Sequence, residues 1–206
     1  MKNLFWIAFC LAPFQVIVAQ NTFKLINPSF EANVPSTGIT PKDWVNIGIE
    51  SETPPDIQPG QFGVYLPAQD GRCYLGLVVR DNSTWEGVGQ ELKGFLKKDS
   101  SYTFSLYLAR SEQYKSPTKT SPNMMLFNAP TILRIWGYNT TTQKEELLAE
   151  TLAIGSSDWT LYDFVLKPTQ GDFNELDLSA YYAPGYEKKN GSLLIDNCSP
   201  IVRVTK

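Results

Sequence analysis

The chain has 206 residues, of which 42% are hydrophobic and 13% aromatic, and 18 basic and 21 acidic side chains leave a formal net charge of −3. This composition is that of one globular domain with a sizeable core, and it lacks the clustered Lys and Arg of a nucleic-acid-binding protein. Histidine is absent, which excludes histidine-based catalytic triads and imidazole zinc sites.

The first nineteen residues have the pattern of a secretory signal peptide. Lys2 is the only charge before an apolar run from Leu4 to Ala19. The run is shorter than the roughly 20 residues that cross a bilayer, and Pro13 interrupts it, so a retained anchor is the weaker interpretation. We therefore expect export to the medium or the cell surface, no membrane span in the mature chain, and one domain over residues 20–206.

Strands are predicted along most of the remaining chain. Ser101–Arg110 alternates clearly, with Tyr102, Phe104, Leu106 and Leu108 on one face. About nine short strands, separated by turn clusters and not by helices, predict an all-β fold in which two antiparallel sheets form a β-sandwich. The main expected strands are 23–26, 74–79, 85–92, 101–110, 131–138, 159–166, 175–182 and 192–204.

Two segments do not follow this pattern. Ser111–Pro130 contains three prolines and little alternation, so we expect a long loop. Gln143–Leu152 consists of good helix formers, but its place between two strands also suits an edge strand, and its state is left open.

The oxidation state of the cysteines depends on whether the chain is exported to an oxidising compartment. Cys10 leaves with the signal peptide, so an exported chain keeps Cys73 and Cys198. A disulfide between them is one interpretation. Two buried free thiols that pack as small apolar groups are the other.

No catalytic constellation stands out, and we expect a protein that is not an enzyme. Glycoside hydrolysis requires two positioned carboxylates, and nothing in the scattered acidic residues selects a pair. A Gly-x-Ser-x-Gly nucleophile motif is missing, and the cysteines have no histidine partner.

Several short segments together resemble a known family. Their order resembles that of the galactose-binding-like jelly roll of carbohydrate-binding modules, especially modules attached to xylanases, and of small exported bacterial proteins that carry this sandwich alone. The segments are Leu25–Glu31 (LINPSFE), Trp44, Gly71–Gly76 (GRCYLG), Trp85–Leu92 (WEGVGQEL), Ser101–Tyr107 (SYTFSLY) and Leu194–Asn197 (LIDN).

The resemblance implies a structural calcium ion that ties the first strand to the last through Glu31 and Asp196. Calcium takes six to eight oxygen ligands, so we add Asp70, before the strand entry at Gly71, as a candidate third carboxylate. The alternative is that Glu31 caps a turn and Asp196 is a solvated strand residue.

An aromatic surface is the candidate ligand site. Alternation in residues 131–138 places Arg134, Trp136 and Tyr138 on the face opposite the core, and Tyr107 points outward on its own strand. Flat apolar rings with polar neighbours suit the pyranose rings of a glycan. In the alternative, the 111–130 segment covers Trp136 and extends the core.

Three further tryptophans have other expected roles. Trp44 and Trp159 stand at strand starts and are assigned to packing, whereas Trp85 fits either packing or the ligand surface. Two functions follow from the outward aromatic residues: a non-catalytic module that binds a glycan or polysaccharide, or a structural or adhesive protein that binds a cell-surface protein through the same side chains.

Overall fold

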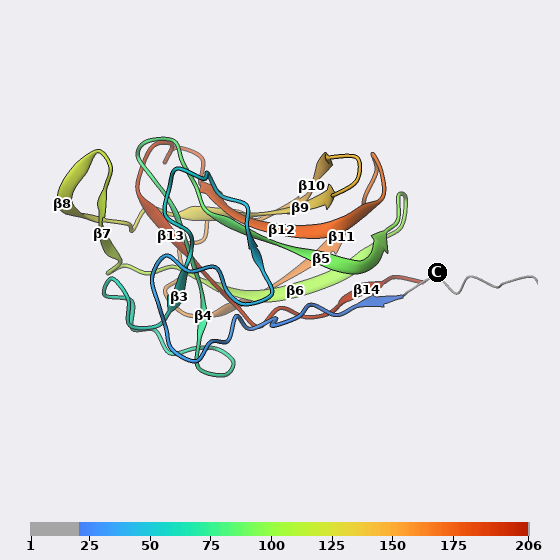
Figure 1. Ribbon diagram of the computed structural model, residues 1–206, viewed down its shortest axis with the longest axis horizontal. Coiled ribbons are helices and arrows are strands. Elements are labelled where there is room, and N and C mark those ends of the chain that lie inside the picture. The colour runs from blue at the N-terminus through green and yellow to red at the C-terminus, as the bar shows by residue number, and fades with distance from the viewer. Residues whose placement is uncertain (1–20, 206) are drawn as a thin grey trace, which may run out of the picture.

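The computed structural model describes residues 21–205, so the predicted signal peptide lies outside the described residues. Two curved antiparallel sheets face each other, and a small hairpin projects from one end (Figure 1). Residues 21–205 contain no helix, hence none that is long and apolar enough to cross a membrane. The predicted all-β jelly-roll sandwich is confirmed.

The larger sheet has seven strands in the order β1-β14-β6-β13-β4-β3, and β11 also pairs with β6. Its strands are β1 (Thr22–Phe23), β3 (Asp56–Gln58), β4 (Tyr74–Val79), β6 (Tyr102–Ala109), β11 (Thr160–Leu166), β13 (Gly191–Asp196) and β14 (Ile201–Arg203).

The smaller sheet has five strands in the order β10-β9-β12-β5-β2. A separate two-stranded hairpin pairs β7 with β8. These strands are β2 (Val45–Asn46), β5 (Gly87–Leu96), β7 (Lys115–Thr118), β8 (Ser121–Leu126), β9 (Thr131–Asn139), β10 (Lys144–Glu150) and β12 (Phe173–Tyr182).

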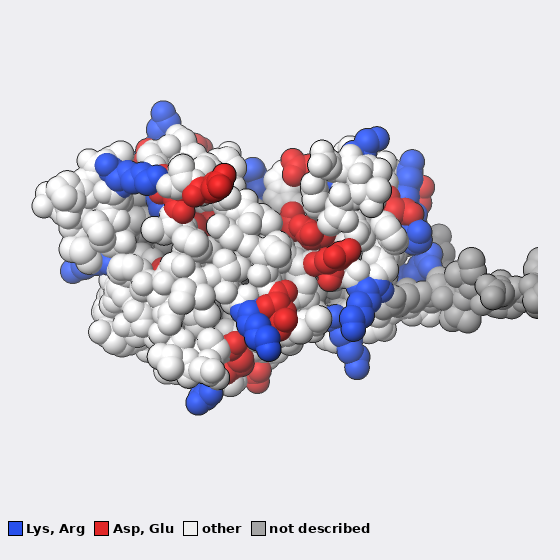
Figure 2. All heavy atoms as spheres, viewed as in Figure 1, with Lys and Arg blue, Asp and Glu red and all other residues white. Residues whose placement is uncertain are grey.

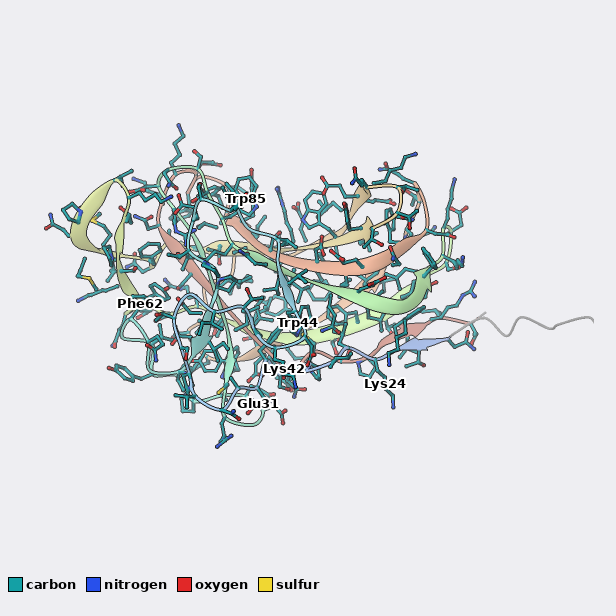
Figure 3. All side chains as sticks on the ribbon, in the orientation of Figure 1. Lys24, Glu31, Lys42, Trp44, Phe62 and Trp85 are labelled. Carbon is teal, nitrogen blue, oxygen red and sulfur yellow. The ribbon has the colours of Figure 1, made fainter. Side chains whose placement is uncertain are left out.

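The core lies between the two large sheets because each sheet turns one alternating set of apolar side chains inward. Leu133 and Ile135 on β9 are fully buried, as are Leu106 and Leu108 on β6. Burying one such side chain is worth about 1.5–3 kcal/mol. Trp44 is buried as predicted and packs on Phe30 at a ring-centroid distance of 5.0 Å (Figure 3).

The two ends of the described chain lie side by side. Thr22 pairs with Val202, and Phe23 pairs with Ile201, so β1 completes the sheet edge next to β14. The expectation that the sandwich joins its first strand to its last is confirmed.

The structure corrects two of the expected segments and settles the one that was left open. The expected loop 111–130 contains the hairpin β7–β8; Pro117 and Pro122 are tolerated there because an isolated two-stranded ribbon has free edges. The segment left open at 143–152 is the edge strand β10, which pairs with β9. The expected strand 192–204 divides into β13 and β14, so the described residues form fourteen strands and not nine.

Cys73 and Cys198 are both buried and unbonded. Burial raises the pKa of the Cys198 thiol above its ordinary value, and the nearby Asp196 raises it further. Cys198 therefore packs in the apolar core, whereas the buried Cys73 thiol donates to the carbonyl oxygen of Ala32 at 3.6 Å.

Candidate functional site

An open cleft lies on the outer face of the five-stranded sheet. Its volume is about 630 Å³, which is within the range of ligand sites. The cleft is lined by Ile47, Trp85, Gly87, Arg134, Trp136, Tyr138, Glu145, Glu175, Asp177, Ser179 and Tyr181.

Strand register positions these side chains in rows across the sheet. Trp136 on β9 lies opposite Asp177 on β12, and Asp177 lies opposite Gly89 on β5. One row further, Arg134 lies opposite Ser179, which lies opposite Gly87. Since the two glycines have no side chain, Ile47 packs directly over Gly87, and the carboxyl groups of Asp177 and Glu175 approach Gly89.

Aromatic rings form one wall of the cleft. Trp85 and Tyr181 pack edge to face at a centroid distance of 5.1 Å, and Trp85 is found near the start of β5 (Figure 3). Trp136 is half-buried, and its indole Nε1 donates to Ser179 Oγ at 3.3 Å. The ring is thus fixed in orientation while its face remains accessible.

Arg134 lies at the same end of the cleft as Tyr181. Its guanidinium carbon lies 3.6 Å from the centre of the Tyr181 ring, and its Nε lies 3.2 Å from Glu150 Oε2. Stacking and ion pairing together hold the guanidinium plane against the aromatic wall.

The other end of the cleft is acidic. Glu175 lies directly opposite Glu91 across β12 and β5, and Asp177 and Glu145 are neighbours. Acidic side chains gather in a hollow over β5 and β12 (Figure 2). Burial raises the pKa of Asp177 to about 8, and Glu175 and Glu145 add to this shift; burial also raises the pKa of Glu175.

Three of the four predicted ligand residues meet in this cleft. Arg134, Trp136 and Tyr138 share it, as their alternation on β9 indicated. Tyr107 does not join them: it belongs to β6 of the other sheet, where it lies opposite Leu161 and Asp196. Alternation identified its outward direction but carried no information about which sheet contains the strand.

The alternative in which the 111–130 segment covers Trp136 is not what the structure shows, since none of those residues lines the cleft. Trp159, assigned to packing, is half-buried and packs edge to face on Tyr74 at 5.1 Å.

Sequence reasoning missed most of the β12 contribution. Glu175, Asp177, Ser179 and Tyr181 occupy alternate positions on that strand and all line the cleft. The same alternation that selected the β9 residues was present there, but only the pairing of β9 with β12 shows that the two sets meet.

The predicted calcium ligands surround the loop that precedes β4. Glu31 Oε1 accepts hydrogen bonds from the amides of Arg72 (2.7 Å) and Cys73 (2.8 Å). Asp196 Oδ2 accepts from the amide of Gln69 at 2.8 Å and from that of Asp70 at 3.0 Å.

The side chain of Asp70 accepts from Ser29 Oγ at 2.8 Å. Glu31 and Asp196 accept backbone N–H donors, and no group of three or more Cys, Asp or Glu side chains in residues 21–205 has metal-binding spacing. Calcium binding stays a prediction.

Comparison with known proteins identifies relatives by structure only. No protein-family model matches the chain, and no curated protein matches it. The xylan-binding CBM22-1 domain of Paenibacillus barcinonensis Xyn10C is similar at 16% identity and a TM-score of 0.53, over 90% of this chain and 97% of that one. The CBM22-1–GH10 modules of Clostridium thermocellum Xyn10B are similar at 15% identity and a TM-score of 0.51, over 91% of this chain and 29% of that one.

Cyclases have a similar fold. A Stig cyclase from Fischerella sp. TAU, solved with an indole compound, is similar at 14% identity and a TM-score of 0.56, over 89% of this chain and 97% of that one. The chain therefore has the jelly-roll fold of galactose-binding-like carbohydrate-binding modules, and at these identities the likeness establishes the fold alone.

Proposed function

We propose that this chain is an exported, non-catalytic module that binds a glycan in the cleft of the five-stranded sheet. One observation carries the proposal: Trp136, Tyr138, Trp85 and Tyr181, from three regions of the chain, line one open cleft of about 630 Å³. Similarity to xylan-binding modules supports the same assignment.

The cleft has the chemistry that sugar recognition requires. The faces of Trp136 and Tyr138 offer flat apolar surface for the C–H faces of pyranose rings. Arg134, Ser179 and Glu175 supply donors and acceptors for ring hydroxyl groups.

Charge restricts the class of glycan to neutral polymers. Glu91, Glu145 and Glu175 lie at one end of the cleft, whereas Arg134 at the other end is paired with Glu150. Uronate or sulfate groups would meet net negative potential here, so neutral polysaccharides are favoured over acidic ones.

The acidic residues do not suit hydrolysis. Glu175 and Asp177 stand two residues apart on one strand and lie close enough for Glu175 to raise the pKa of Asp177, whereas hydrolytic carboxyl groups stand about 5–10 Å apart to flank the scissile bond. This arrangement supports binding without turnover.

The test is a glycan array that includes xylans, galactans and polyuronates, probed with the mature protein. Wild type should bind neutral polymers, Trp136→Ala should abolish the signal, and Trp136→Phe should restore part of it. Tyr107→Ala is the matched control, because this half-buried aromatic lies on the other sheet. A blank array with wild type, together with a co-purifying surface protein, would contradict glycan binding and favour the protein-binding alternative.

Export is part of the proposal and has its own test. The leader at residues 1–19 supports secretion to the medium or the cell surface. Protein recovered outside the cells should begin at Gln20 or Asn21. A chain that keeps Met1 and stays in the cytoplasm would contradict export.

A further inference from the structure

A second pocket lies between the loops that precede β4 and the hairpin β7–β8. Its volume is about 320 Å³, and it shares no residue with the glycan cleft. Its lining includes Asp56, Phe62, Arg80, Tyr114, Lys119 and Phe127.

Arg80 is the central polar group of this pocket, and only 5% of it is exposed. Its Nη2 donates to Glu86 and, at 2.8 Å, to Thr53 Oγ1, and its Nε lies 3.9 Å from Glu52 Oε2. Its Nη1 is buried and has no hydrogen-bond partner. A guanidinium stays charged and its donors cannot be removed by deprotonation, so the unpaired Nη1 has a donor that a bound molecule can use.

Three aromatic rings surround the space next to Arg80. Phe62 stacks on Tyr114 at a centroid distance of 5.3 Å with an interplanar angle of 28°, and Phe127 packs against Tyr114 at a tilt of 54°, also at 5.3 Å. Phe62 lies near the base of the hairpin (Figure 3). Such walls suit a flat ring with apolar faces.

The charges around the pocket are nearly matched. Arg80 pairs with Glu86, and Lys119 Nζ lies 3.3 Å from Glu52 Oε1. Asp56 accepts hydrogen bonds from the Tyr114 hydroxyl at 2.5 Å and from the amide of Gly38 at 2.9 Å. An anionic ligand would face the carboxyl groups of Glu52 and Asp56, and a cationic one would face Arg80 and Lys119, so a neutral ligand fits best.

Side-chain contacts at the tip of the hairpin hold the hairpin over the pocket. Lys119 Nζ also donates to the carbonyl of Ser51, and Thr120 Oγ1 lies 3.0 Å from both carboxylate oxygens of Asp81. These contacts hold Ser116 and Thr118 in the pocket wall. The hairpin, which belongs to neither large sheet, thus completes the pocket.

We propose that this pocket binds a neutral, single-ring molecule whose oxygen accepts a hydrogen bond from Arg80 Nη1, independently of the glycan cleft. A volume of 320 Å³ limits the ligand to about one ring with its substituents. Two sources share this chemistry, a single pyranose unit and a neutral aromatic ring with a carbonyl group.

Ligand-observed NMR on the mature protein tests the proposal with three probes: methyl β-galactopyranoside, methyl β-xylopyranoside and benzamide. At least one probe should bind wild type. Phe62→Leu and Arg80→Lys should each weaken it about tenfold, the equivalent of roughly 1.4 kcal/mol. Binding of a pyranoside or of benzamide tells which source supplies the ring.

Two controls keep this test separate from the glycan cleft. Trp136→Ala should leave probe binding unchanged, and so should Phe95→Leu, a matched change at an exposed site on β5. If circular dichroism shows that the Arg80→Lys variant does not fold, the binding measured for Phe62→Leu alone tests the proposal.

A wild-type protein that binds none of the three probes, and so holds only solvent in the pocket, would overturn the proposal. A probe lost in Trp136→Ala but retained in Phe62→Leu, or bound equally well by folded Arg80→Lys, would also overturn it.

Discussion

Asp177 and Glu175 stand two residues apart on β12, both line the cleft, and the charge of Glu175 raises the pKa of Asp177. Asp177 is only 7% exposed, and burial raises its pKa to about 8. The pair therefore shares one proton near neutral pH, because a buried carboxylate next to a half-buried one is not readily ionised without a cation.

Protonation of Asp177 predicts a pH-dependent stability. Its unfolded pKa is about 3.9, below the folded value of about 8, so between these values the folded state binds more protons. The contribution of protonated Asp177 to the free energy of unfolding is complete below about pH 4 and is lost as the pH rises towards 8. Asp177→Asn should flatten this fall and raise Tm at pH 8, by roughly 2–4 °C for each kcal/mol gained.

Thermal melts of both proteins from pH 4 to pH 8 check this expectation. The matched control Asp163→Asn, at an exposed position on β11, should keep the wild-type profile. Parallel pH profiles for Asp177→Asn and wild type would show that Asp177 does not carry the effect.

Glu31 is predicted to stabilise the loop before β4. Its Oε1 accepts two backbone amides, and charge-assisted hydrogen bonds are about twice as strong as neutral ones. Glu31→Gln should lower the free energy of unfolding by about 1 kcal/mol in urea titrations. Glu112→Gln, at an exposed ion pair with Arg110, should change it little; equal losses in both variants would contradict a specific role for Glu31.

Calcium binding at Glu31, Asp70 and Asp196 has a direct test in thermal melts. An ion that binds only the folded state raises Tm, so a calcium site at these residues requires a higher Tm in saturating calcium than in chelator, and a smaller difference in Asp70→Asn. Identical Tm values for the wild type in the two conditions would contradict a calcium site and leave these carboxylates as acceptors for the loop amides.

Alanine substitutions at two glycines are expected to have opposite effects on stability. A Cβ at Gly191 would lie 2.5 Å from the carbonyl oxygen of Ala129, whereas a Cβ at Gly155 would meet no atom within 4 Å. Gly191→Ala should destabilise by about 1–3 kcal/mol, and Gly155→Ala should stabilise by up to about 1 kcal/mol through the unfolded state. Urea unfolding measures both; a Gly191→Ala variant as stable as Gly155→Ala would refute the steric argument.

Local alternation was enough for part of the candidate site. The face shared by Arg134, Trp136 and Tyr138 was predictable because side chains on one strand alternate with a period of two. Alternation was not enough for Tyr107, because it predicted the outward direction of this side chain but not the sheet to which its strand belongs. The β7–β8 hairpin was missed because its prolines resemble loop residues when the pairing partner is unknown.

By itself, the sequence determined that this protein is an antiparallel sandwich without histidine chemistry, and that one strand turns aromatic and cationic side chains away from the core. Only the tertiary structure decided that β12 lies beside β9, which brings Asp177 against Trp136, and that Arg80 meets the aromatic rings of the second pocket. The physical reason is that alternation and turn chemistry act between neighbours in the chain, whereas strand order is set by packing among residues far apart in it.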